Sequence, residues 1–200
     1  MPEHLQAVAD VLEMAAFAAQ RGWVPATSGN FSRRIDRQRI AITRSGADKT
    51  KLSKDDVIIV DVNDPMAEGA SAETPLHASR YRHNAAIEAI MHVHSITSTV
   101  ASRLFEPDGA IEMRGYEMHK ALPGFTTHES ALSIPIFANS QDTQALAEEI
   151  EQSLHEEGVP GYLIAGHGLY VWGASVAAAC RHVEALDFLL ACAVEEWRQR

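Results

Sequence analysis

The C-terminal part of the sequence contains a long amphipathic segment that needs a broad apolar partner. Between Ala174 and Trp197 apolar residues recur with helical spacing. The stripe consists of Val176, Ala179, Cys180, Val183, Leu186, Leu190, Val194 and Trp197. Because a stripe of this width and length is broad enough to cover a β-sheet, we predict a fold in which this helix packs on one.

Further helices and strands alternate along the chain without a strict strand-helix-strand period. Helical spacing and capping residues predict helices over His4–Gln20, Thr74–Asn84, Ile96–Phe105 and Gln141–Gly158. Apolar runs between turn-formers predict strands that include Ile40–Thr43, Val57–Pro65, Ala89–Val93, Ile134–Asn139, Tyr162–Ile164 and Leu169–Trp172. Since neither GxGxxG nor a Walker loop occurs, an α/β sandwich of helices around a mixed sheet is favoured over a doubly wound nucleotide-binding fold.

The net charge and the cysteines of the sequence indicate which binding partners and which cellular compartment to expect. A formal charge of -10, from 17 Lys+Arg against 27 Asp+Glu, argues against a nucleic-acid or anionic membrane partner and favours a small molecule. No run of eighteen apolar residues occurs, and Glu3 and Asp10 stand where a signal peptide carries basic residues. Cys180 and Cys192 lie about 18 Å apart on the predicted helix and cannot pair there. We therefore expect a cytoplasmic protein.

Two histidines flank one valine in the apolar segment "IMHVHS". On a strand, His92 and His94 point to the same face with Cα atoms about 6.5 to 7 Å apart, so that both imidazoles can bind one ion. His167, between Gly166 and Gly168 at a predicted tight turn, is the best candidate for a third ligand. The alternative interpretation is that the pair are ordinary hydrogen-bonded core residues.

Other polar residues have less specific patterns. His77 and His83 share a predicted helix, where exposure to solvent is expected. The loops "ATSGN" and "TRSG", with Ser71 ahead of a predicted helix, offer hydroxyl and backbone N–H groups suited to a phosphate, although such residues are also common in turns. Glu73 and Glu117 are candidate acid/base groups in turn-rich segments, and residue patterns alone do not choose between them.

Five segments, taken together and in order, resemble the class II aldolase/adducin family: "TSGNFS", "ITRSGADK", "SAETPLH", "MHVHS" and "GHGLYVWG". The resemblance covers nearly the whole chain. It implies a single domain over residues 1–200, with an α/β/α sandwich around a mixed, mostly antiparallel sheet. "GYEMHKAL", "TTH" and "RHVEALDFL" further resemble the branch of this family that removes water from a sugar phosphate in methionine salvage.

The resemblance also implies roles for individual residues. His92, His94 and His167 would bind one zinc ion per subunit, Glu117 would be the general acid/base, and Glu73 matches the acid/base of the aldolase branch, which is a metal ligand when substrate is absent. The phosphate site would contain Ser28, Gly29, Asn30, Ser45, Gly46 and Ser71, with Lys120 as a further candidate. A homotetramer with sites at subunit interfaces is expected on the same grounds.

Two alternative functions remain. The first is a class II sugar-phosphate aldolase or 4-epimerase that uses the same zinc site. The chain ends at Arg200, where those branches continue into a tail with a tyrosine, and this difference favours dehydration. The second is a non-catalytic adducin-like binding domain, for which loss of the metal-binding histidines would be expected, whereas all three are present.

Overall fold

A mixed sheet runs through the computed structural model, which describes residues 2–154 and 158–200. Its strands are β1 (Asn30–Arg34), β2 (Arg39–Thr43), β3 (Val57–Asp61), β4 (Ala89–Val93), β5 (Ala110–Met113), β6 (Leu132–Phe137), β7 (Gly161–Ile164) and β8 (Gly168–Gly173). Their spatial order is β3-β2-β1-β4-β8-β7-β6-β5. β6 and β7 are parallel and every other neighbouring pair is antiparallel. The expected mixed, mostly antiparallel sheet is confirmed.

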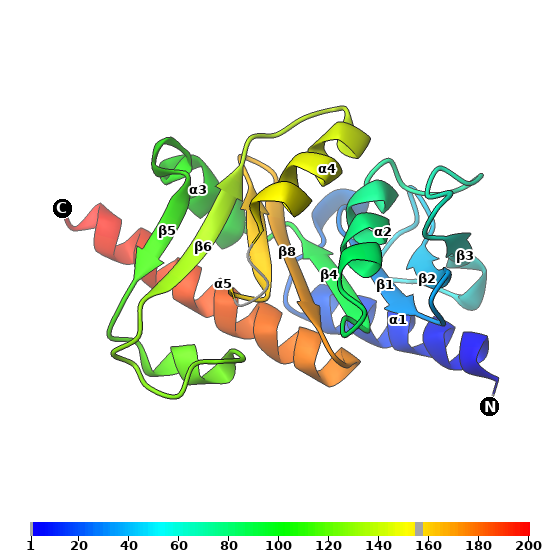
Figure 1. Cartoon of the computed structure of the whole chain (residues 1–200), viewed down its shortest axis with the longest axis horizontal. Helices are drawn as coiled ribbons and strands as arrows, with labels where there is room; N and C mark the ends of the chain where they lie inside the picture. The colour runs from blue at the N-terminus through cyan, green and yellow to red at the C-terminus, as the bar shows by residue number, and fades with distance from the viewer. Residues whose placement is uncertain (1, 155–157) are drawn as a thin grey trace.

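Helices cover both faces of this sheet (Figure 1). α1 (Glu3–Gln20), α3 (Ile96–Leu104) and α5 (Val176–Arg198) pack on one face, and α2 (Thr74–His83) and α4 (Thr143–Ser153) lie together on the other. Short 3₁₀ helices are η1 (Pro25–Thr27), η2 (Lys54–Asp56), η3 (Glu106–Asp108) and η4 (Glu117–Ala121). The predicted α/β/α sandwich is therefore confirmed. None of the described helices is long and apolar enough to cross a membrane.

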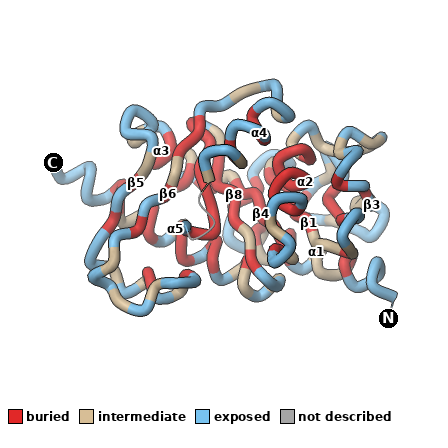
Figure 2. Tube along the Cα trace, viewed as in Figure 1, coloured by how far each residue is buried: buried red, intermediate tan, exposed pale blue. Residues whose placement is uncertain are grey.

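Alternation along β4 divides the buried residues between the two faces. Ala89, Met91 and Val93 belong to the core beneath α1, α3 and α5, whereas Ile90 belongs to the core beneath α2 and α4. His92 follows the alternation of Ile90 and stacks on Tyr170, which lies in that second core. Figure 2 shows the central strands and α2 as the most continuously buried part of the chain. His92 is thus fixed on the α2 side of the sheet.

α2 is buried although its sequence is polar. Eight of its residues are buried, from Thr74 to Tyr81, because the helix is enclosed by the sheet and α4. The helix starts where "ETP" predicts, with Pro75 in its first turn, but the N-cap is Glu73 rather than Thr74. Glu73 therefore projects from the N-terminal end of α2.

The structure corrects two further boundaries. α4 has Asp142 as its N-cap, with the Asp142 carboxylate accepting the Ala145 N–H, whereas the sequence favoured Ser140. The predicted helix extended to Gly158, but α4 ends at Ser153 because Leu154 is already extended; residues 155–157 lie outside the described part of the chain.

Sequence patterns missed β5, an edge strand that pairs with β6. Only Ile111 and Met113 of its four residues are buried, which is too short a pattern to separate from a loop. The chain then enters η4, which packs against α5. Glu117 consequently lies in the α1/α3/α5 layer, on the opposite side of the sheet from α2.

The close approach of β4 and β8 gives a test of the fold. A Cβ added at Gly168 would lie 2.3 Å from the Val93 carbonyl oxygen, so Gly168→Ala must push the strands apart. We expect a loss of about 3 kcal/mol in the free energy of unfolding, measured with urea. The control is Gly22→Ala, where nothing lies within 4 Å and only the positive φ of 72° is unfavourable; about 1 to 2 kcal/mol is expected there. A Gly168 variant as stable as wild type would contradict this packing.

Candidate active site

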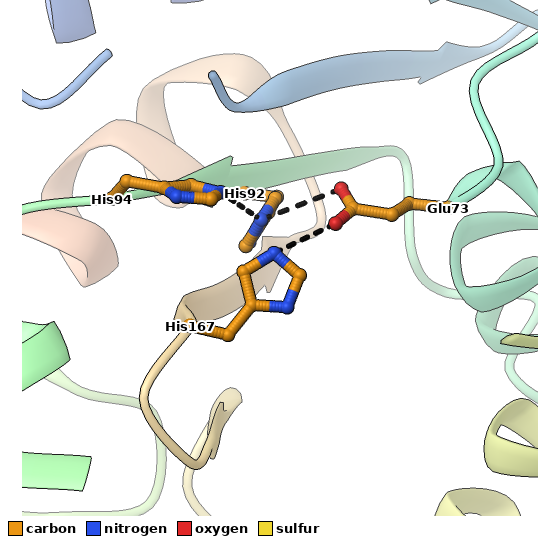
Figure 3. A group of neighbouring side chains, drawn as sticks. All are labelled: Glu73, His92, His94 and His167. Atoms are coloured by element: carbon orange, nitrogen blue, oxygen red, sulfur yellow. Dashed lines mark hydrogen bonds and ion pairs between the residues drawn. The ribbon is translucent and has the colours of Figure 1, made fainter. Parts of the chain in front are cut away.

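Three imidazoles and one carboxylate meet at the end of β4 (Figure 3). His92 is in β4, His94 follows that strand, His167 lies in the β7–β8 turn and Glu73 is the N-cap of α2. One potential ligand atom from each residue lies within 4.8 Å of the others. The structure thus places the three histidines that the sequence singled out together, and adds Glu73 to them.

The spacing of the ligand atoms suits a small metal ion. His92 Nε2 is 2.7 Å from His94 Nε2 and 3.4 Å from a Glu73 oxygen, and His167 Nε2 is 2.7 Å from the other Glu73 oxygen. Ligand atoms of a tetrahedral zinc site with bonds of about 2.0 Å lie about 3.3 Å apart. The donor set therefore needs only small shifts to enclose an ion, and its nitrogen and oxygen atoms are ligands that zinc accepts.

Hydrogen bonding and burial prepare the imidazoles as ligands. His92 Nδ1 is 3.2 Å from the Leu169 carbonyl oxygen, to which it donates, so that Nε2 keeps its lone pair for a metal. Burial lowers the pKa of His92 well below its usual value and lowers that of His94 to about 4. Both side chains are consequently neutral near pH 7, the form that binds metal.

Glu73 is held in its charged form. Burial alone would raise the pKa of this carboxyl, but the neighbouring His92 and His167 hold it below the usual value, with a further hydrogen bond from Asn30. The carboxylate thus adds one negative charge to the three imidazoles, which favours a divalent cation.

A buried chain of hydrogen bonds orients the Glu73 carboxylate. The Asn30 amide NH₂ donates to Glu73, and the Asn30 amide oxygen accepts from His77 Nε2. His77 Nδ1 then accepts from the Ser32 hydroxyl at 2.7 Å, and the Tyr81 hydroxyl donates to the Ser32 carbonyl oxygen at 3.0 Å. The expectation that His77 faces solvent is wrong: its side chain is fully buried. Both ends of the Asn30 amide are engaged, so Asn30 orients Glu73 as well as lining the adjacent cavity.

A cavity of about 250 Å³ opens beside Glu73 and His94. All six residues predicted for the phosphate loops line it: Ser28, Gly29, Asn30, Ser45, Gly46 and Ser71. Thr27, Ala72 and two cationic residues, Arg44 and Lys49, complete the lining. The Ser28 hydroxyl is buried and has no hydrogen-bond partner among the described residues. We refer to this cavity as the anion pocket, after the phosphate that the family resemblance leads us to expect there.

Sequence reasoning missed Lys49. It lies within the segment "ITRSGADK" that carried part of the family resemblance, but a lysine just after a Ser-Gly turn is normally exposed. Its burial follows from the packing of this loop against residues 25–29 and was not visible in the sequence pattern.

Glu117 and Lys120 lie elsewhere in the chain. Glu117 is an exposed residue of η4, 2.6 Å from Lys120 Nζ and 3.2 Å from His128 Nδ1. The hydrogen bond from Lys120 lowers the pKa of the Glu117 carboxyl. Neither residue is among the described residues that line the anion pocket or form the histidine group. Within one chain, the structure does not bring the predicted acid/base to the predicted metal ligands.

The fold and this site define a class of protein: a mixed sheet between two helix layers, with a three-histidine, one-glutamate metal-binding group beside an anion pocket. The chain belongs to the class II aldolase and adducin family, because the sequence profile of the Class II Aldolase and Adducin N-terminal domain matches residues 9–194.

Solved structures share the fold. L-fuculose-1-phosphate aldolase from Thermus thermophilus superposes with a TM-score of 0.76 at 24% identity, covering 100% of both chains. YgbL from Klebsiella pneumoniae superposes with a TM-score of 0.79 at 22% identity, covering 96% of this chain and 89% of YgbL. At these identities the likeness concerns the fold alone.

Two relatives whose sequences are more similar to this chain than those of the solved structures share the same name. Methylthioribulose-1-phosphate dehydratase of Parvibaculum lavamentivorans is 49% identical over 192 residues, which are 96% of this chain and 94% of that protein. The protein of the same name from Xanthomonas campestris is 50% identical over 182 residues, which are 88% of this chain and 83% of that protein.

Removal of a histidine tests the metal site. We expect His92→Ala to lower zinc affinity at least 100-fold, because a ligand is lost and the group retains too few imidazoles to hold the ion tightly. Metal content after dialysis, measured by mass spectrometry, gives the result. His4→Ala, which changes an exposed histidine at the start of α1, is the control. Equal zinc content in the His92 variant and the wild type would show that this is not the metal site.

Because His77 is buried, we predict that the free energy of unfolding depends on pH. Burial lowers its pKa to about 4, from 6.5 in the unfolded chain, although the Glu73 charge partly opposes the shift. Between these values the unfolded chain binds more protons, so His77 makes the folded state less stable as the pH falls from about 6.5 to 4. At pH 5 this contribution is about 2 kcal/mol relative to pH 8.

The His77→Gln variant isolates this contribution. We expect the unfolding free energy of metal-free His77→Gln to fall less between pH 8 and pH 5 than that of metal-free wild type, as measured with urea. His4→Gln, which changes an exposed histidine at the start of α1, is the control. Parallel pH profiles for wild type and the His77 variant would contradict a neutral, buried His77.

Proposed function

We propose that the protein is a zinc-dependent methylthioribulose-1-phosphate dehydratase. It converts 5-methylthioribulose 1-phosphate into 2,3-diketo-5-methylthiopentyl 1-phosphate and water, a hydro-lyase reaction of methionine salvage. The observation that carries this proposal is the shared boundary of two sites: Glu73 and His94 belong to the metal-binding group and also line the anion pocket. Relatives about 50% identical over most of the chain, named for this activity, support the choice of substrate.

The two neighbouring sites suit the two ends of a phosphorylated ketose. The Ser28–Gly29 and Ser45–Gly46 turns line the anion pocket, and their serine hydroxyl groups can donate hydrogen bonds to a phosphate. The adjacent carbonyl would then lie toward His94 and Glu73. The three histidines would hold a divalent ion, which would supply Lewis-acid polarisation of this carbonyl. Fe²⁺, Co²⁺ or Mn²⁺ would also suit the ligand types, and we favour zinc on coordination geometry and family resemblance.

Glu117 is the acid/base of this proposal, supplied by a second copy of the chain. Its carboxylate is exposed in η4 and lies on the α5 side of the sheet, so it cannot serve the histidines of its own chain in this conformation. In the expected homotetramer, Glu117 and Lys120 of one subunit would reach the site of another. There Glu117 moves the proton at the carbon beside the carbonyl or at the departing hydroxyl.

A sugar-phosphate aldolase or 4-epimerase is the second candidate. The observation in its favour is the position of Glu73, whose carboxylate already contacts His92 and His167 and could move a proton without a second chain. A non-catalytic adducin-like role receives no support, because the histidine group is intact. For either enzyme we propose the cytoplasm as the location, where cysteines such as the unpaired Cys180 and Cys192 stay reduced.

The Glu117→Gln variant tests the assignment of the acid/base. Loss of a general acid/base lowers kcat by about 100-fold or more, while the zinc content stays at one ion per chain because Glu117 is not a ligand. The assay incubates the zinc-loaded protein with methylthioribulose 1-phosphate and follows the diketone. Glu129→Gln, at a neighbouring exposed acid, is the control. Near-normal turnover of Glu117→Gln would refute its assignment as the acid/base.

Mixed oligomers test whether the site is shared between copies. When His92→Ala and Glu117→Gln chains are produced together, a site with a normal histidine group from one chain and a normal Glu117 from another should form in about one quarter of cases. We therefore expect activity well above that of either variant alone. If both residues act within one chain, no mixed oligomer contains an intact site and activity stays at the level of the single variants.

A further inference from the structure

A buried cation in the anion pocket, Lys49, has no role in the proposal above. The residue is 4% exposed, although it belongs to a surface loop. Its ammonium donates to the Thr27 carbonyl oxygen at 2.9 Å and to the Ala47 carbonyl oxygen at 2.8 Å. Neutral carbonyls compensate only part of the cost of removing an ammonium group from water. A lysine held in this way is therefore suited to an anion that completes its coordination.

The two carbonyls belong to the two loops that face each other across the pocket. One is the segment 25–29, in which Ala26 and Thr27 have left-handed φ angles of 50° and 66° that residues with a Cβ rarely adopt. Gly29 is also left-handed, with a φ of 77°, and a Cβ there would lie 2.8 Å from the His92 carbonyl oxygen. The surroundings must hold this unfavourable turn in place. Lys49 does so directly, because it binds the carbonyl of Thr27.

The charge of Lys49 also distinguishes it from the other lining residues. Burial lowers the pKa of its ammonium, whereas Glu73, Asp48 and Asp56 raise it. Arg44, the other cation among the described residues that line the pocket, is exposed to solvent. Lys49 is therefore the cation shielded from water at this site, where a charged hydrogen bond to an anion is strongest.

The geometry points to Lys49 as a positioning and phosphate-binding residue. Two of its N–H groups hold the Thr27 and Ala47 carbonyls and so fix the distance between the loops, and the third donates to a phosphoryl oxygen of the substrate. The inference rests on the proposed function only in taking the ligand to be a phosphate monoester. It predicts that Lys49 contributes to the preference for a phosphorylated sugar and leaves the proton-transfer step to other residues.

Inorganic phosphate is the probe for binding. By calorimetry on the zinc-loaded protein, we expect Lys49→Met to bind phosphate about 10- to 100-fold more weakly than wild type, the range for loss of a charged hydrogen bond. Zinc content should be unchanged, because the variant leaves the four metal-binding side chains intact. Lys51→Met changes an exposed lysine of the same loop and should bind phosphate as wild type does.

Kinetics separate binding from catalysis. For methylthioribulose 1-phosphate, KM of Lys49→Met should rise by a similar 10- to 100-fold while kcat changes by less than about 3-fold. A merely structural lysine would lower the zinc content or kcat together with KM. The inference is overturned if Lys49→Met shows phosphate affinity and KM within about 2-fold of wild type.

A second variant tests the inference even if Lys49→Met does not fold. Lys49→Gln keeps an N–H donor for the loop carbonyls but has no charge, so it should fold and still lose phosphate affinity; wild-type phosphate affinity in that variant overturns the inference. The outcomes also separate the two proposals. If wild type does not dehydrate the substrate but its phosphate binding depends on Lys49, the proposed function is wrong and the role of Lys49 stands.

Discussion

The pairing of β4 with β8 is the contact on which the site depends. It sets His92 opposite Tyr170 and brings the β7–β8 turn, with His167, to the end of β4. This approach is possible because Gly168 has no side chain: a Cβ there would collide with the Val93 carbonyl and lie 3.0 Å from His92 Cε1. Two segments separated by more than seventy residues thus supply ligands to one group. A rigid scaffold of this kind suits a metal site, since the ligand directions are set before an ion binds.

The same arrangement explains why α2 is buried although its sequence is polar. A helix with this composition would ordinarily cover a surface, yet it lies inside the molecule because its polar side chains bind one another and β1. The chain from Tyr81 through Ser32, His77 and Asn30 ends at the Glu73 carboxylate. Each member has a partner, which is the condition for a buried polar network to stabilise rather than weaken a core. The network orients the one formal charge of the metal-binding group.

Particular residues show how far the sequence alone could lead. The apolar pattern predicted α5 because it is long, and β4 because it is a continuous apolar run. The geometry of a strand then indicated that His92 and His94 point to the same face. The glycines around His167 predicted a tight turn between two strands, and the structure has that turn between β7 and β8. The burial of His77 and Lys49 left no such signal, since it arises from segments that meet only in the folded chain. The missed strand β5 has a different cause, because its apolar pattern is too short to be distinguished from that of a loop.

The separation of Glu117 from the histidines has a chemical consequence. In the single chain the carboxylate is exposed and paired with Lys120, which lowers its pKa and makes it a poor proton acceptor near neutral pH. Contact with a second subunit would remove water from this carboxylate, and desolvation raises the pKa of an acid. If Lys120 at the same time turned toward a phosphate or another anion, the pairing that lowers the pKa would also be relieved. On the proposed function, assembly would therefore do more than bring Glu117 to the metal: it would move the pKa of Glu117 toward the range in which proton transfer is efficient, and a dissociated subunit would retain its ligand-binding pocket without an effective acid/base.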